Sequence, residues 1–63
     1  MDSLRLFNEL THKWLDIVRH YYLHALPLTN EFHQMDALYT WLLRSLDLDK
    51  LLQFQKLIRD EGF

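Results

Sequence analysis

The 63-residue sequence contains no cysteine, one glycine and one proline. Without cysteine, the chain has no disulfide framework, no thiolate ligand for zinc and no cysteine nucleophile. A β-sandwich or β-barrel needs many turns, and one glycine with one proline is too little turn-forming sequence for such a fold. The sequence therefore predicts an all-α fold. It also predicts one domain over residues 1–63, because a chain of this length has no room for a second.

The sequence also lacks an excess of positive charge and long apolar runs. Seven Lys and Arg residues against nine Asp and Glu residues give a formal net charge of -2. This balance excludes a strongly basic chain that binds nucleic acid through charge alone. No run reaches the roughly 18 apolar residues of a transmembrane helix, and the N-terminus does not resemble a signal peptide. We expect a cytoplasmic protein without a membrane span.

Large apolar residues are abundant and recur at helical spacing in three segments. The first helix is predicted over about residues 2–26, with Asp2 as its N-cap and Met1 and Leu6 as a hydrophobic staple. Pro27 is expected to end this helix, because proline disfavours helical geometry at the residue before it. The apolar face of this helix fills about half of its circumference. Its members are Leu4, Phe7, Leu10, Trp14, Leu15, Ile17, Val18, Tyr21, Tyr22 and Ala25.

A short proline-containing loop and two shorter helices follow. The second helix is predicted over about residues 31–46, with Thr29 or Asn30 as its N-cap, and the third over about residues 48–60, with Asp47 as its N-cap. Since neither glycine nor proline separates these segments, one continuous helix is the alternative. The helical wheel favours two helices, because the apolar faces before and after the break point about a third of a turn apart.

The third helix has a natural stop at its end. Gly62 is expected to end it, since glycine readily adopts the left-handed conformation that follows many helices. Phe63 could then fold back on the last turn. The predicted architecture is thus a long N-terminal helix, a loop and two shorter helices.

The amount of apolar side chain favours association with another protein. Leu, Ile, Val, Met, Phe, Tyr and Trp account for 29 of the 63 residues, whereas a domain of this size buries only about 60% of the surface of its extended chain. One neighbouring helix also cannot cover the wide apolar face of the first helix. We expect a second copy in a twofold dimer, or another protein, to cover the rest. The alternative is a compact three-helix monomer with a large core.

Trp41 is the clearest candidate for an interface. It lies off the apolar stripe of the second predicted helix, among small and polar residues, with Leu38 as the nearest member of the stripe. Tryptophan is rare on polar faces and common where proteins bind one another. We predict that Trp41 and Leu38 belong to an intermolecular surface, together with Trp14 and Tyr21 from the wide face of the first helix. The alternative for Trp41 is a core face wide enough to include it.

Histidine and aspartate step by four along the first helix, at His12, Asp16, His20 and His24. His20 and His24 could hold one metal ion with Asp16 as a third ligand, because residues four apart are neighbours on a helix. The row drifts around the helix axis, however, and no Cys or His pair elsewhere completes a site. We interpret these residues as a solvated, ion-paired face, and predict no metal and no cofactor.

No pattern of catalytic residues is present. Ser3 and Ser45 are the only serines, and neither lies in a nucleophile-elbow pattern. A single glycine cannot build a phosphate-binding loop. Three short helices also leave little room for a pocket that excludes water. We therefore predict that the protein is not an enzyme.

DNA binding is the alternative function. The second and third helices have about the turn length of a helix-turn-helix motif, and a dimer could present Arg5, Lys13 and Arg19 to phosphates. The turn itself carries Asp47 and Asp49, which repel phosphates, so nucleic acid is not the favoured partner. The favoured interpretation is a small regulatory protein that binds another protein through exposed apolar and aromatic surface, as a homodimer. A dimeric DNA-binding transcriptional regulator is the alternative.

Overall fold

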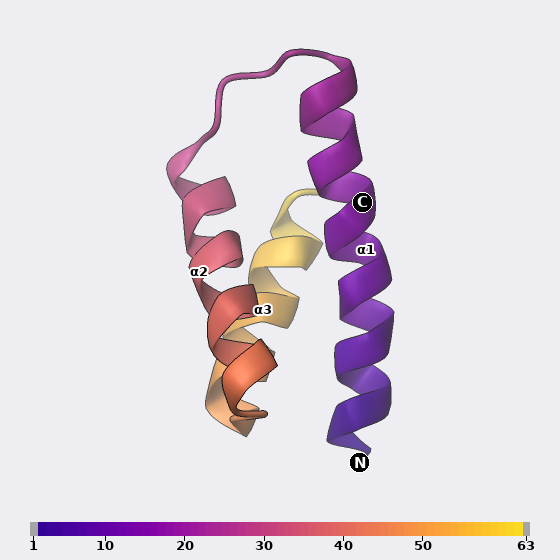
Figure 1. The fold of residues 1–63 in the computed structure, drawn as a ribbon, viewed down its shortest axis with the longest axis vertical. Helices are drawn as coiled ribbons and strands as arrows, with labels where there is room; N and C mark the ends of the chain where they lie inside the picture. Colours follow the sequence, from indigo (N-terminus) through magenta and orange to yellow (C-terminus); the bar gives the residue numbers. More distant parts are fainter. Residues whose placement is uncertain (1, 63) are drawn as a thin grey trace.

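The structure is a computed structural model that describes residues 2–62. These residues form three helices and no strand: α1 (Ser3–Leu23), α2 (Asn30–Arg44) and α3 (Leu48–Asp60). α1 and α2 run antiparallel, and α3 lies behind them, close to both (Figure 1). The prediction of an all-α chain with one long and two shorter helices is confirmed.

Polar side chains determine where each helix begins. Asp2, Thr29 and Asp47 are the N-caps, and each side chain accepts a hydrogen bond from a backbone N–H of the first turn, at 3.2, 3.1 and 2.9 Å. Each cap satisfies a donor that the helix itself leaves unpaired. The predicted caps are therefore confirmed, and the cap at Asp47 separates α2 from α3. The predicted contacts of Met1 and Phe63 lie outside the described residues.

α1 ends at Leu23 rather than near residue 26, so its predicted end was wrong. The backbone N–H groups of Ala25 and Leu26 donate back to the carbonyls of Tyr22 and Tyr21, at 3.3 and 3.0 Å. This pair of hydrogen bonds is the Schellman motif, which requires a left-handed residue after the helix. Ala25 occupies that position with φ of 50°. The chain therefore leaves the helix before the proline that was expected to end it.

α2 also ends earlier than predicted, at Arg44 instead of near residue 46. Ser45 is extended, with φ of -150° and ψ of 122°, and its carbonyl accepts a hydrogen bond from the N–H of Asp47 at 2.8 Å. This tight turn allows α3 to begin at Leu48, as predicted, and to fold back along α2. α3 ends at Asp60, and Gly62 has φ of 81°, in agreement with the expected glycine stop.

The core lies between the three helices and is rich in aromatic side chains. α3 lies close to both other helices, whereas α1 and α2 meet mainly through aromatic rings. The ring of Trp14 lies 5.0 Å from that of Phe32 and 6.1 Å from that of Phe54, so it joins all three helices. The buried core residues are Leu10, Trp14, Ile17, Tyr21, Phe32, Met35, Leu42, Leu51, Phe54 and Ile58.

Candidate protein-binding surface

The four residues predicted at an interface fall into two groups. Trp14 and Tyr21 are only 4% and 7% exposed, because residues of their own chain enclose them. Leu38 is half-buried against the edge of the core, and Trp41 is 51% exposed. The middle of the wide α1 face is thus covered within one chain. Trp14 and Tyr21 present almost no surface to a partner, whereas Trp41 does.

The hydroxyl group of Tyr21 makes polar contacts with residues at the ends of the other two helices. It lies 3.4 Å from the hydroxyl of Thr29 and 3.3 Å from a carboxylate oxygen of Glu61, to which it donates. These contacts join the end of α1, the start of α2 and the end of α3. Because Glu61 is distant in sequence, the periodicity of the first helix gave no sign of this contact. Tyr21 therefore acts as a core residue that also connects the three helices.

Trp41 is held in place without being buried. It lies in the last turn of α2, where its carbonyl accepts a hydrogen bond from the N–H of Ser45 at 3.0 Å. The ammonium group of Lys50, on α3, lies over the indole at 5.2 Å from the ring centroid. A cation at this distance is attracted by the π-electrons of the ring. The lysine lies over the ring, and half of the tryptophan residue remains open to solvent.

A groove of about 320 Å³ lies between α2 and α3. Helical spacing puts Gln34, Leu38 and Trp41 on one side of α2, and Lys50 and Leu57 on one side of α3. The indole and its lysine therefore belong to the same side of the molecule as the groove. The residues that line the groove are Gln34, Gln53, Lys56, Leu57 and Asp60. We call the groove, Leu38, Trp41 and Lys50 together the α2–α3 surface.

The sequence prediction contained only the α2 half of this surface. Gln53, Lys56, Leu57 and Asp60 were not predicted, although their spacing along α3 puts them on one side of that helix. Their position beside Gln34 of α2 depends on how the turn at Ser45 folds α3 back. Spacing within one helix carries no information about that turn.

A second apolar region lies where α1 joins α2. α3 does not reach the loop end of α1 (Figure 1), and a hollow of about 370 Å³ lies there. Tyr22 and Leu23 are 80% and 74% exposed. The hollow is lined by Tyr21, Tyr22, Ala25, Leu26 and Leu28. Leu26 and Leu28 are also exposed at this end of the molecule.

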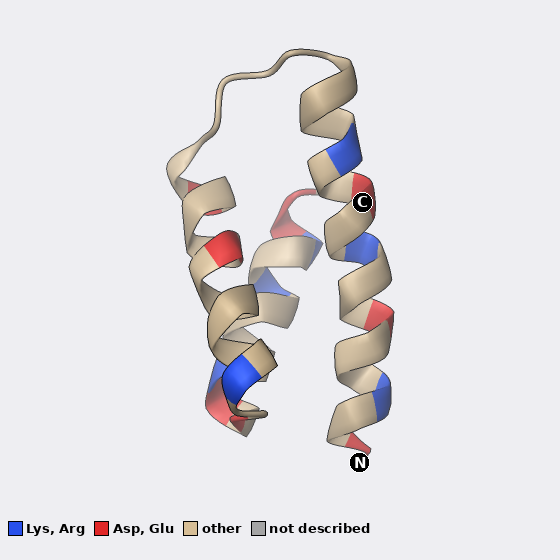
Figure 2. Cartoon of the chain, in the orientation of Figure 1, with Lys and Arg blue, Asp and Glu red and all other residues tan. Residues whose placement is uncertain are grey.

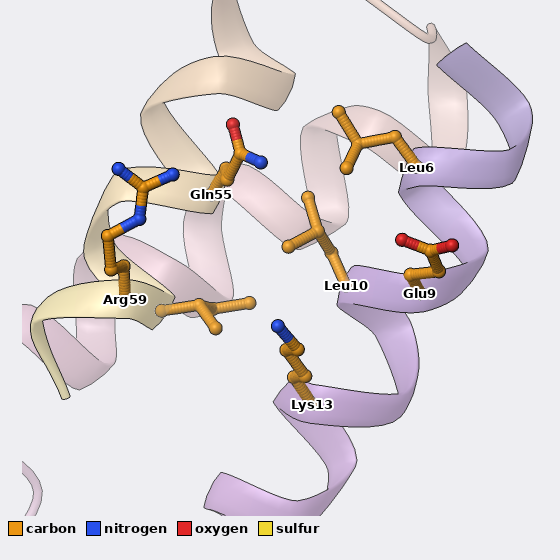
Figure 3. Close-up of a pocket in the computed structure, with 7 residues that line it drawn as sticks. Leu6, Glu9, Leu10, Lys13, Gln55 and Arg59 are labelled. Atoms are coloured by element: carbon orange, nitrogen blue, oxygen red, sulfur yellow. The ribbon is translucent and has the colours of Figure 1, made fainter. Parts of the chain in front are cut away.

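A smaller groove of about 130 Å³ lies between α1 and α3 (Figure 3). Its walls combine Leu6 and Leu10 of α1 with Arg59 of α3, and the charged Glu9 and Lys13 lie on the α1 side. A space of this size is far below the roughly 300–1,000 Å³ of typical small-molecule sites. The groove therefore offers no substrate pocket.

The histidine row of α1 does not assemble into a larger cluster. The rings of His20 and His24 lie 4.5 Å apart, as expected for neighbours on one helix. His12 and Asp16 are exposed further along the same helix. Among residues 2–62, no group of three or more His, Cys, Asp or Glu side chains is placed to hold a metal ion.

The charges are dispersed. Lys and Arg alternate with Asp and Glu along α1 (Figure 2), so this helix carries no continuous basic face. Lys50 of α3 is placed over the indole of Trp41. The arrangement lacks the basic stripe that is typical of proteins that bind phosphate backbones.

No protein-family model matches the sequence, and no curated protein or solved structure matches it significantly. The described helices contain no segment that is long and apolar enough to cross a membrane.

Proposed function

We propose that the protein is a small, non-catalytic regulatory module that binds another protein through the α2–α3 surface, with Trp41 as the principal contact. The half-exposed indole is the observation that carries this proposal. α2 already contributes Phe32, Met35 and Leu42 to the core, so folding does not require a tryptophan on its other side. Tryptophan is among the residues that most often dominate the affinity of a protein interface.

The composition of the surface supports the same proposal. Apolar groups, Trp41 and Leu57, lie beside amides and charges from Gln34, Gln53 and Lys56. Protein interfaces commonly combine an apolar centre with a polar rim in this way. The lysine over the indole attracts the ring by about 0.5–1 kcal/mol, which favours this position of the indole before a partner binds. A partner segment with an aliphatic or aromatic side chain would pack beside the indole and hydrogen-bond to the amides.

Self-association is part of this proposal. Eleven large apolar residues among the described part of the chain are at least 38% exposed, and they occur on more than one side of the molecule. Because the α2–α3 surface includes only Trp41 of these eleven, a homodimer can use a different surface. The DNA-binding alternative gains no comparable support, since acidic Asp47 and Asp49 flank the turn and the neighbouring Lys50 lies over the indole.

The proposal is tested with Trp41→Ala and a matched control, Leu52→Ala. Leu52 is 43% exposed, close to the 51% of Trp41, but it lies on a different side of α3 from the groove. Each variant, checked for helicity by circular dichroism, is used to capture proteins from the native host. We expect Trp41→Ala to weaken partner binding by about 2 kcal/mol, or about 30-fold, and Leu52→Ala to leave it nearly unchanged.

Equal capture by the two variants would contradict the proposal. The salt dependence of the binding affinity distinguishes protein binding from the DNA-binding alternative. An apolar protein contact should change little between low and moderate salt, whereas DNA affinity should fall steeply as counterions compete for the phosphates.

A further inference from the structure

An apolar row runs along the whole length of α1, beside α2 and only partly covered by it. Its members are spaced by three or four residues: Leu4, Phe7, Thr11, Leu15, Val18 and Tyr22. Leu4, Leu15 and Tyr22 are 59%, 50% and 80% exposed, and the other three are half-buried. We call these six residues the α1 row. Such spacing keeps side chains on one side of a helix and is typical of a seam between paired helices.

The α1 row borders α2 on the side of the molecule that faces away from α3. Phe7 stacks on Tyr39 of α2, with ring centroids 5.6 Å apart. Leu6 and Lys13 of α1 line the groove between α1 and α3 (Figure 3), and helical spacing puts them on the opposite flank of α1 from the row. In Figure 1, α3 lies behind the α1–α2 pair, and no helix lies in front of it. The row therefore remains open on a side where a further helix could lie.

The row contains no charged residue. Two members carry a hydroxyl group. That of Thr11 donates to the carbonyl of Phe7 at 2.9 Å, and Tyr22 is 80% exposed at the end of the row. Covering the row would therefore leave no threonine hydroxyl without a partner. A twofold contact between identical surfaces brings like charges close to one another, and a row without charged residues avoids that repulsion.

The row is nearly symmetric about residue 13. Leu4 and Tyr22 each lie nine residues from it and Thr11 and Leu15 each two, while Phe7 lies six and Val18 five residues away. An antiparallel pair of helices needs matching spacing in opposite directions. The row meets that requirement against a copy of itself, which argues for a second copy as its occupant.

We propose that a second copy of this chain packs on the α1 row, with the two α1 helices antiparallel about a twofold axis near residue 13. This arrangement places Leu4 opposite Tyr22 of the second copy, Phe7 beside Val18, and Thr11 opposite Leu15. It rests on the homodimer of the proposed function and identifies its seam. The seam then lies beside the buried Trp14 and Tyr21 instead of at them, and leaves Trp41 free for another protein.

The exposed area agrees with a modest but specific dimer. If a whole Leu or Tyr side chain has roughly 150–200 Å² of surface, the three exposed members present on the order of 350 Å² per copy. With the half-buried members of both copies, the contact removes about 1,000 Å² from water. That area is at the lower limit of specific interfaces. We therefore expect dissociation in the micromolar range.

The first test compares Leu15→Glu with Leu23→Glu by sedimentation over a micromolar concentration range. Leu23 is 74% exposed on the same helix but lies outside the row. We expect the unchanged protein and Leu23→Glu to form dimers, and Leu15→Glu to stay monomeric with unchanged helicity. A monomeric unchanged protein, or a Leu15→Glu variant that dimerises normally, would overturn the seam.

The second test measures the direction of the helices. Because the chain contains no cysteine, introduced thiols report only their own proximity. A mixture of Leu4→Cys and Tyr22→Cys chains should form the mixed disulfide faster than either chain links to itself, since linked residues need Cα atoms within about 7 Å. Faster self-linking would indicate parallel helices and contradict the arrangement.

The experiments can refute the α1 seam and the partner site on the α2–α3 surface independently of each other. If Trp41→Ala abolishes dimerisation while Leu15→Glu does not, the seam is at the α2–α3 surface and the α1 row is wrong. If Leu15→Glu gives a monomer while Trp41→Ala has no effect on partner capture, the seam stands and the proposed partner site is wrong.

Discussion

Replacing Ala25 with glycine should stabilise the protein. Ala25 has φ of 50° in the connection after α1. The left-handed conformation strains a residue that has a Cβ atom by roughly 1–2 kcal/mol, and glycine avoids this strain. Glycine also has more conformational freedom in the unfolded chain. This freedom lowers the free energy of unfolding by about 0.4–1 kcal/mol and offsets part of the stabilisation. The expected net effect is an increase of about 0.5–1 kcal/mol in the free energy of unfolding.

The control for this prediction is the only other alanine of the chain. Ala37 lies inside α2 and is exposed, so Ala37→Gly should lower the free energy of unfolding by about 0.5–1 kcal/mol. Urea unfolding followed by circular dichroism measures both variants. The melting temperature should rise by a few degrees for Ala25→Gly and fall by a few degrees for Ala37→Gly. Destabilisation by both substitutions would refute the left-handed conformation of Ala25.

Two further predictions concern the core. Tyr21→Phe removes the hydrogen bond to Glu61 and should lower the free energy of unfolding by about 0.5–1.5 kcal/mol. The control, Tyr22→Phe, is at a position 80% exposed and should change the free energy of unfolding little. Equal effects of the two variants in urea unfolding would contradict a role for the Tyr21 hydroxyl. Trp14→Ala should cost about 3–5 kcal/mol because it leaves a cavity among three helices. The same substitution at half-exposed Trp41 should cost much less, and thermal unfolding of the two variants should rank them in that order.

The sequence predicted those parts of the fold that depend on local chemistry. The cap at Asp47 and the bounds of α3 were correct, because an N-cap needs only a side chain that reaches the backbone two or three residues ahead. The predicted end of α1 was wrong because the sequence carries no local signal for it. A left-handed residue is signalled in sequence by glycine, and here an alanine takes that position.

The exposure of the residues of the candidate surface could be predicted only where one helix decides it. The angle of Trp41 on its helix placed it off the stripe, and it is half-exposed. Trp14 lies at the centre of a wide apolar face, and the angle alone could not show that Phe32 and Phe54 would enclose it. The contact of Lys50 with Trp41 depends on the turn between two helices, and periodicity within either helix does not specify it.

Site-specific photo-crosslinking in the native host tests the central claim most directly. A photoreactive residue at Gln53 lies in the groove of the α2–α3 surface, and the same residue at Asp16 lies on an exposed part of α1. We predict that the Gln53 position forms a defined adduct with another protein, that Trp41→Ala abolishes this adduct, and that the Asp16 position does not form it. The same adduct from both positions, or a Gln53 adduct that persists in the Trp41→Ala variant, would contradict binding through this surface.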